Sequence, residues 1–281
     1  MKTTFGKTAT YTIVRNEIKH IKTWLFYASK YSDYMVLLDT GSTDGTWEYL
    51  VEATNQHPNL IIEQKTFSPW NFSVARNYNL GMVPDDVSWC LEMDGDEYFS
   101  INVLKEMERI IAVRPDVTNI STTRLDIYSE EVFVGPPNHL PSNKIHRKND
   151  YKWVSPIYEH LRWVHTDRPE VELHSDKCFP IHDQDFMKAE RSPLYLKMLL
   201  DEYETNPRNC WTLWFLVNHY YKEQDLENFT RTACDYIKYN DKFDERYHSI
   251  LQELTNIFKF STGSSADDIK LIGETIRGKS I

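Results

Sequence analysis

The feature that most constrains the fold is an alternation of strand-like apolar runs and amphipathic helical segments at the start of the chain. Apolar or β-prone runs lie at residues 10–14, 34–38, 60–64 and 87–93, and apolar residues recur at helical spacing between them. A continuous apolar run is typical of a strand that is buried on both faces. The pattern therefore predicts an α/β fold with a mostly parallel sheet and helices on both of its faces.

Polar residues follow three of the predicted strands. Arg15, Asn16 and Glu17 follow the first strand, a turn-rich segment at 39–45 follows the second, and an acidic segment at 94–97 follows the fourth. Ligands of parallel sheets bind beyond the carboxyl ends of the strands. We therefore expect these three segments to meet at one edge of the sheet.

The acidic segment carries the sharpest chemical signal, because Asp94 and Asp96 stand one residue apart at the end of a buried strand. Alternate residues of a strand project to the same side, and carboxylate oxygens suit Mg²⁺ or Mn²⁺. The alternative is an ordinary turn rich in Asp and Gly. The two neighbouring polar segments favour a site over a turn.

The rest of the chain changes character twice. Residues 101–185 are less regular, with a helix predicted at 103–113, a strand at 117–127 and a proline-rich loop at 136–141. From residue 186 to residue 281 the pattern is wholly helical. The chain is therefore expected to end in a small all-α region.

The helical region contains a helix–turn–helix that resembles one tetratricopeptide-type unit. Asp225 stands at the turn, Ala233 lies in the second helix, and a further helix is predicted at 193–204. Val217 occupies the position where such repeats usually have a small residue. We therefore interpret the region as a degenerate tetratricopeptide-like repeat.

Composition excludes several classes of protein. With 281 residues, 41% of them hydrophobic, the chain can bury a sizeable core, and nine glycines argue against fibrous or low-complexity structure. We expect no transmembrane segment, since no stretch approaches ~18 consecutive apolar residues, and no secretory signal. The four cysteines lack the spacing of a zinc site or a disulfide framework. A cytoplasmic location is the expectation.

A formal net charge of −10 disfavours non-specific binding to nucleic acids or anionic membranes. One segment departs from this balance, because Lys144, His146, Arg147, Lys148 and Lys152 lie close together. The segment is interpreted either as a solvated loop or as a patch that meets a phosphorylated acceptor, including DNA with a modified base.

Taken together, these motifs resemble those of family 2 glycosyltransferases, which have the GT-A fold, a Rossmann-like sheet. The resemblance covers residues 8–100 and is carried by the segments at 14–17, 39–46, 72–77 and 91–97. It implies a nucleotide-sugar half at residues 1–100, an acceptor half at 101–185 and a separate helical region at 186–281.

The resemblance also implies roles for single residues. Asp39 would accept a hydrogen bond from the nucleotide base, typically uracil, and Arg76 would face the base or the diphosphate. Asp94 would contact the ribose or a metal-bound water, and Asp96 would bind the metal. The residues expected to bind the donor are Val14, Arg15, Asn16, Glu17, Asp39, Ser42, Arg76, Asp94 and Gly95.

The second half extends the resemblance to bacterial and phage members of the family. In these members a His–Glu pair follows an arginine-bearing strand, and residues 144–148 and 153–161 are similar to that segment. Tyr158 stands in the place of the His, whereas Glu159 is present. The match to this motif is therefore partial.

An inverting transfer needs a base that takes the acceptor proton. Glu159 is the first candidate for this base, and Asp126, at the end of its predicted strand, is the second. The alternative for Glu159 is a structural carboxylate that pairs with Arg147 or Arg162.

Residues 179–183 resemble the strand end that supplies a metal-binding histidine in many GT-A enzymes. Imidazole is a suitable ligand for Mn²⁺. The expected metal ligands are therefore Asp94, Asp96 and His182, and the alternative for His182 is a lone histidine in a loop.

The sequence thus favours a metal-dependent, inverting glycosyltransferase that uses Mn²⁺ or Mg²⁺ and a UDP-sugar donor. The acceptor stays open between a glycan, a polypeptide and a modified DNA base, and a homo-oligomer is possible. One alternative is a nucleotidyltransferase, but those enzymes usually have a glycine-rich first loop, and residues 14–17 contain no glycine. The other alternative is a non-catalytic binding module that works through the helical repeat.

Overall fold

The structure is a computed structural model, and it describes residues 3–128, 133–134, 138–183, 192–240 and 245–262. The chain divides into two compact units, Met1–Lys188 and Ala189–Ile281. The domain boundary expected at residue 185 lies outside the described residues.

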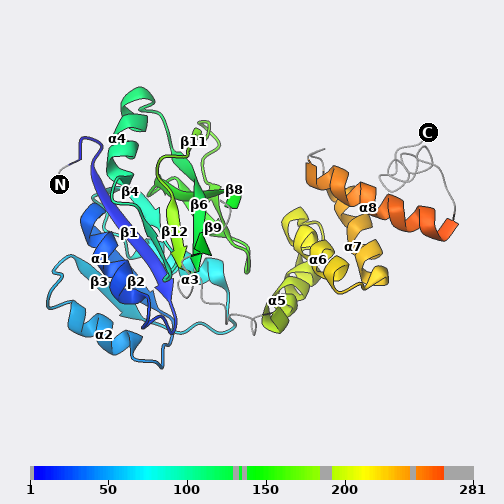
Figure 1. The fold of residues 1–281 in the computed structure, drawn as a ribbon, viewed down its shortest axis with the longest axis horizontal. Coiled ribbons are helices and arrows are strands. Elements are labelled where there is room, and N and C mark those ends of the chain that lie inside the picture. Colours follow the sequence, from blue (N-terminus) through cyan, green and yellow to red (C-terminus); the bar gives the residue numbers. More distant parts are fainter. Residues whose placement is uncertain (1–2, 129–132, 135–137, 184–191, 241–244, 263–281) are drawn as a thin grey trace. The chain divides into compact units, whose positions relative to one another are not determined.

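The first part of the larger unit has the predicted alternation of strands and helices (Figure 1). Its strands β3, β2, β1 and β4 are neighbours in that order and run parallel. The elements are β1 (Lys7–Val14), α1 (Ile21–Tyr31), β2 (Tyr34–Asp39), α2 (Thr46–Ala53), β3 (Leu60–Gln64), α3 (Phe72–Gly81) and β4 (Val87–Glu92). The register pairs Val14 with Asp39 and Asp39 with Gln64, so these strands end at one level.

The second part extends the same sheet with strands of both directions. The order continues from β4 through β8, β6 and β12 to β5, and β8 is antiparallel to both β4 and β6. The elements are β5 (Glu97–Phe99), α4 (Val103–Val113), β6 (Asn119–Tyr128), β7 (Phe133–Val134), β8 (Asn138–Arg147), β9 (Tyr151–Val154), β10 (His160–Trp163), β11 (Glu172–Ser175) and β12 (Pro180–Asp183). Strands β9 and β10 form a separate hairpin.

One local prediction was wrong. Pro141 lies inside β8 rather than in a loop, while residues 135–137 lie outside the described part of the chain. Helix α3 begins after Asn71, whose side chain accepts a hydrogen bond from Val74 N at 3.1 Å. Ser73 donates its hydroxyl to Asn71 Oδ1 at 2.9 Å. Asn is among the preferred capping residues.

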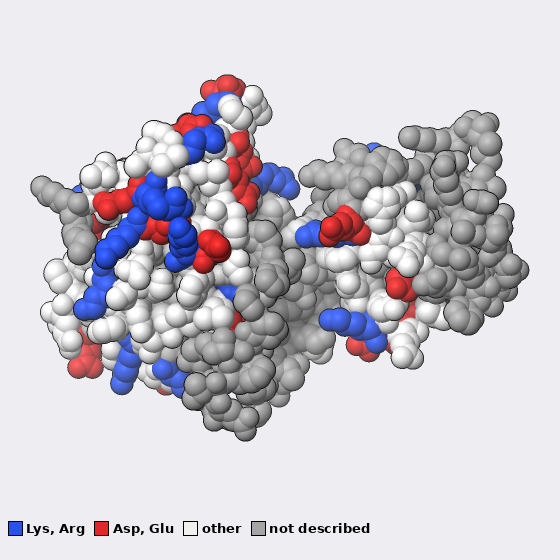
Figure 2. Space-filling model, turned by 45° about the horizontal axis from the view of Figure 1, so that its top comes forward, with Lys and Arg blue, Asp and Glu red and all other residues white. Residues whose placement is uncertain are grey.

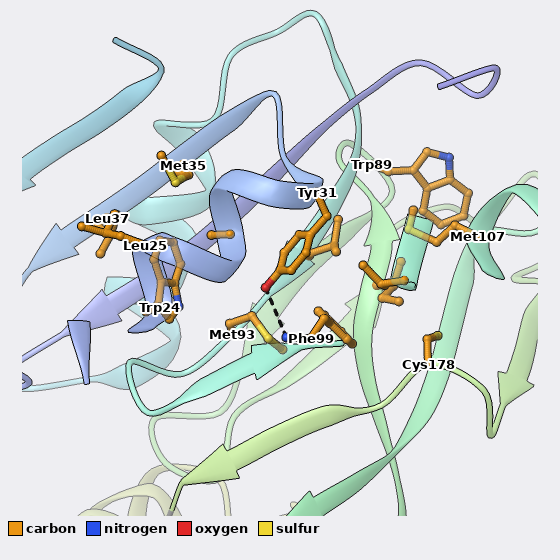
Figure 3. Packing of buried hydrophobic residues seen from close by; sticks show 14 of the residues in the cluster. Trp24, Leu25, Tyr31, Met35, Leu37, Trp89, Met93, Phe99, Met107 and Cys178 are labelled. Carbon is orange, nitrogen blue, oxygen red and sulfur yellow. Dashed lines mark hydrogen bonds between the residues drawn. The ribbon is translucent and has the colours of Figure 1, made fainter. Parts of the chain in front are cut away.

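The main core lies between the sheet and helices α1, α2 and α4. Figure 3 shows its large side chains, among them Trp24, Met35, Trp89 and Phe99, which are almost fully buried. The Tyr31 hydroxyl accepts a hydrogen bond from Phe99 N at 3.2 Å, which holds the end of α1 against β5. This core fixes the helices against the sheet, at whose carboxyl edge the polar segments lie.

A second core covers the opposite face of the sheet. Tyr11, Val36 and Cys90 point from the strands toward this face, and Tyr151 and Trp153 cover them from the β9 strand. Helix α3 packs on the same face, beside β1 and β9. The sheet is thus covered on both faces, as predicted.

The smaller unit is helical, as predicted. It contains α5 (Ser192–Thr205), α6 (Cys210–Lys222), α7 (Leu226–Tyr239) and α8 (Glu245–Thr262). Asp225 caps α7 by accepting a hydrogen bond from Asn228 N at 3.1 Å, and Val217 and Ala233 are buried. The likeness to a tetratricopeptide unit stays a prediction.

Within the described residues, no helix combines the length and the apolar character that a membrane span requires. The cysteines are free thiols, and Cys90 and Cys178 are fully buried in the two cores. They serve as apolar packing residues.

Candidate active site

The loop after β1 and the loop after β2 interlock. Thr40 donates its N–H and its hydroxyl to Val14 O at 2.9 and 3.1 Å. Asn16 N donates to Ser42 Oγ at 2.9 Å, and Asn16 Oδ1 accepts from Thr43 N at 2.8 Å. Asn16 adopts a left-handed conformation with a φ of 59°, which Asn tolerates better than most residues. These contacts hold the two loops in one fixed arrangement.

The acidic segment after β4 approaches the same loops at Gly95. A Cβ atom at this position would lie 2.9 Å from Glu17 Cγ and 3.2 Å from Val14 Cγ1. Only glycine therefore allows the present packing without a shift. The structure thus brings the three polar segments together at one edge of the sheet, while Arg15 is exposed beside them.

Asp39 is fully buried at the end of β2. Its Oδ1 accepts hydrogen bonds from Gly41 N and Ser42 N, both at 2.9 Å, and from Gln64 Nε2 at 3.0 Å. Its Oδ2 has no hydrogen-bond partner within the described residues. A buried acceptor without a partner is costly, so this oxygen is the atom at which a ligand donor would be stabilised.

Arg76, on α3, is the centre of a buried ion-pair cluster. Its guanidinium donates to Glu92, to Asp94 Oδ1 at 2.6 Å and to Glu159 Oε1 at 2.5 Å. It also lies over the ring of Trp153, 4.9 Å from the centroid. Glu159 therefore pairs with Arg76, and not with Arg147 or Arg162 as in the alternative interpretation of this residue.

Lys144, on β8, is the second cation of this cluster. Its Nζ lies 2.8 Å from Glu92 Oε2, 2.7 Å from Glu97 Oε2 and 3.4 Å from Asp94 Oδ2. Sequence reasoning placed Lys144 in the basic segment and missed this role. The signal was present, because buried carboxylates at a strand end require buried cations.

The two cations set the charge state of the cluster. Burial alone would raise the pKa of Asp94, but the charges of Lys144 and Arg76 hold it well below its usual range. For Glu92 burial outweighs the same two cations, and its pKa is raised. The pKa of Lys144, which burial alone would lower, is raised by Asp94, Glu92 and Glu97. Both cations therefore stay charged at neutral pH.

His182, on β12, lies between two carboxylates. Its Nδ1 is 3.1 Å from Asp126 Oδ1, and its Nε2 is 3.4 Å from Asp96 Oδ2. Burial would lower the pKa of His182, but the hydrogen bond and the charge of Asp96 outweigh it and raise the pKa. Arg124 Nε lies 2.8 Å from Asp126 Oδ1 on the other side. His182 is thus held in place and is not a lone loop residue.

The expected metal ligands are brought together only in part. Asp96 and His182 face each other, whereas the oxygens of Asp94 face Arg76 and Lys144. In the described part of the chain, no three His, Cys, Asp or Glu side chains are grouped so that they could hold an ion. A carboxylate and an imidazole fit Mn²⁺ or Mg²⁺ as two ligands, and the Asp126–His182 contact is the arrangement that orients metal-binding histidines.

The basic segment is mostly buried, so its interpretation as a solvated loop was wrong, while its interpretation as a patch for a phosphorylated acceptor stays a prediction. His146 is fully buried and its Nε2 lies 2.9 Å from the Tyr11 hydroxyl. Arg147 lies over the ring of Trp89, and Lys148 is 8% exposed. Lys152 remains exposed. The alternation of side chains along β8 sends these residues to different places.

An α/β sheet that ends in interlocked loops, a buried acceptor and an acidic segment is the architecture expected of a GT-A glycosyltransferase. The model of the family "Glycosyl transferase family 2" matches residues 13–167, more than half of the chain. The protein therefore belongs to glycosyl transferase family 2 and is a glycosyltransferase. This membership favours the first predicted function over a nucleotidyltransferase or a non-catalytic binding module.

Solved structures show the same fold. The crystal structure of residues 1–349 of TarS from S. aureus matches with a TM-score of 0.55 and 17% identity, over 98% of this chain and 92% of that chain. The same TarS fragment in complex with UDP-GlcNAc matches with a TM-score of 0.52 and 14% identity, over 97% and 90%. A search among curated proteins finds no matching relative.

Proposed function

We propose that the protein transfers a sugar from a UDP-sugar to an acceptor, with inversion at the sugar and with the help of Mn²⁺ or Mg²⁺. The observation that carries the proposal is Asp39, whose Oδ1 is saturated and whose buried Oδ2 is free to accept within the described residues. The structures of similar fold include a TarS fragment in complex with UDP and one in complex with UDP-GlcNAc.

Asp39 Oδ2 favours uracil among the pyrimidines. Uracil presents the N3–H donor, which a carboxylate oxygen accepts, whereas cytosine presents a lone pair at N3 that the same oxygen repels. A mismatch at a buried hydrogen-bonding site is costly because it leaves polar atoms unpaired. Asp39 would therefore select a uridine nucleotide over a cytidine nucleotide.

The diphosphate would lie between the interlocked loops and the cations of the cluster. Arg76 and Lys144 are both engaged with carboxylates of the cluster, so they would hold Asp94 in place beside the diphosphate rather than bind the phosphate oxygens themselves. Asp96 and His182 would hold the metal, with Asp126 orienting the imidazole. When bound, the metal supplies positive charge that stabilises the departing diphosphate.

Glu159 would act as the base. One of its oxygens is held by Arg76, 2.5 Å away, which fixes the orientation of the carboxylate. Its Oε2 would accept the proton of the acceptor hydroxyl while the acceptor oxygen bonds to the anomeric carbon and the bond to the diphosphate breaks. Asp126, the second candidate, is instead engaged with His182 and Arg124.

The test is a calorimetric titration of UDP, CDP, GDP and ADP, with Mn²⁺ and with EDTA. We expect binding of UDP that depends on Mn²⁺, and we expect Asp39→Asn to weaken it at least ~10-fold, since the new amide would place a donor against the N3–H. Asp86→Asn, at an exposed carboxylate paired with Lys7, is the matched control. Equal affinity of the wild type and Asp39→Asn for UDP would refute the base-binding role.

A further inference from the structure

A cavity lies at the other end of the sheet, where the parallel strands begin. It has a volume of about 380 Å³ and is lined by the start of β4, the α4–β6 connection, the β8–β9 turn and Arg168. This size lies within the range of small-molecule sites. Figure 2 tilts this end of the sheet toward the viewer and shows Lys and Arg side chains gathered beside Asp and Glu side chains. The proposed transfer chemistry makes no use of this cavity.

Two carboxylates line the cavity, and both are already engaged. Asp116 accepts two hydrogen bonds from Arg114, each at 2.9 Å. Asp150 is 2.5 Å from Arg168 and 3.0 Å from His165 Nε2. Neither carboxylate is therefore available to neutralise a further cation in the wall.

Arg147 is such a cation. Its guanidinium donates to two main-chain carbonyls, Val117 O at 3.3 Å and Pro115 O at 3.2 Å, and stacks over Trp89 at 4.4 Å. In the described part of the chain it forms no ion pair, in contrast to Arg76. Burial lowers the pKa of Arg147, and the charge of Asp150 offsets this only in part. An under-compensated guanidinium in a cavity wall is stabilised by an anion.

Lys148, the next residue along the chain, also lines the cavity and carries a second positive charge. It is 8% exposed, and its Nζ lies 2.8 Å from Asp85, whose side chain is fully exposed to solvent. A pair with such an exposed partner contributes little and is screened by salt. The wall therefore offers two cations to a ligand, which matches the charge of a phosphate group.

We propose that this cavity is a second anion site, which binds a phosphate group through Arg147 and Lys148 and is separate from the donor site. The group would be free phosphate or the phosphate ester of a larger molecule. The site contains the part of the basic segment that the transfer reaction leaves unused.

The test is a titration of the full chain with inorganic phosphate at low salt, in the presence of saturating UDP and Mg²⁺. We expect one phosphate to bind, and we expect Arg147→Gln to weaken its binding at least ~10-fold. Lys152→Gln is the matched control, because it removes one charge from the exposed end of the same segment, and it should leave the affinity within ~2-fold. A parallel titration with glycerol phosphate distinguishes free phosphate from a phosphate ester. If glycerol phosphate binds at least as tightly as inorganic phosphate, the ligand is the ester of a larger molecule.

A second variant guards against loss of packing, since the Arg147 stem rests on Trp89. Arg147→Lys keeps the charge and the apolar stem but loses the planar fork, and we expect an intermediate affinity for phosphate. Absence of phosphate binding to the wild type would overturn the proposal. So would equal affinities of the wild type, Arg147→Gln and Arg147→Lys, or complete displacement of phosphate by UDP.

Discussion

Buried cations have different partners at the two ends of the sheet. At the carboxyl end, Arg76 and Lys144 share two carboxylates, Glu92 and Asp94. Arg76 also pairs with Glu159, and Lys144 also pairs with Glu97. At the amino end, Arg147 donates to main-chain carbonyls and stacks on an indole ring. In the first arrangement carboxylates of the protein neutralise the cations, whereas the second leaves positive charge for a ligand.

This difference arises within one strand. Lys144 and Arg147 are three residues apart on β8, but the strand passes from one end of the sheet to the other between its neighbours β4 and β6. Charged residues that are close in sequence can therefore lie in different environments when a strand separates them along its length. The comparison teaches that a run of basic residues is not evidence of a basic surface.

The largest effect is expected at the carboxyl end of the sheet. Arg76→Gln would leave Glu92, Asp94 and Glu159 without their shared cation, and unpaired buried charge is strongly destabilising. We expect the free energy of unfolding to fall by about 3–5 kcal/mol and sugar transfer to be lost. Urea unfolding at pH 7 measures the change, with Arg114→Gln as an exposed control paired with Asp116. A fall in the free energy of unfolding no greater than that of the control would show that the carboxylates of the cluster do not depend on Arg76.

A smaller effect is expected from His146, which lies on β8 between the two ends. Burial lowers its pKa to about 4, from an ordinary value of 6.5. The folded state therefore binds this proton less readily than the unfolded state, so stability is full above pH 6.5 and is lost as the pH falls toward 4. Linkage gives a loss of about 2 kcal/mol between pH 7 and pH 5. Urea unfolding at both pH values measures it, and His146→Gln should flatten the dependence; an unchanged slope in that variant would assign the effect to other groups.

The third effect concerns metal binding, which we expect at the carboxyl end of the sheet and not at the amino end. Asp126→Asn would remove the carboxylate that orients His182, and loss of such a contact weakens metal affinity roughly 10–100-fold. Titration of Mn²⁺ in the presence of UDP measures this, with Asp116→Asn at the other end of the sheet as the control. Equal Mn²⁺ affinity in the two variants would remove His182 and its support from the metal site.

Much of the fold could be predicted because its signals are local. The apolar runs of β2 and β3, the periodicity of α4 and the cap at Asp225 each depend on a few neighbouring residues. Pro141 misled the prediction, since a proline usually excludes a central strand position, yet β8 contains it. The antiparallel place of β8 depends on distant pairings that no local pattern encodes.

The candidate site was predictable as a set of segments but not as a set of contacts. The turn at Asp39 and the pair Asp94 and Asp96 stand out in the sequence, and the structure brings these segments together. The pairing of Arg76 with Glu159 joins residues 83 positions apart, and Lys144 on β8 contacts Glu92 on the neighbouring strand β4, 52 positions away. Such contacts follow from tertiary packing, which is why the ion-pair cluster escaped prediction.

The interlocked loops have a consequence for the energetics of donor recognition. Asn16, Ser42 and Thr43 already hydrogen-bond to one another, and Gly95 lets the side chains of Glu17 and Val14 pack against the acidic segment. A donor entering this pocket would not have to order the loops, so little conformational entropy remains to be lost on binding. Ordering of the loops would therefore offset little of the interaction energy between the nucleotide and the protein, because the site is preorganised.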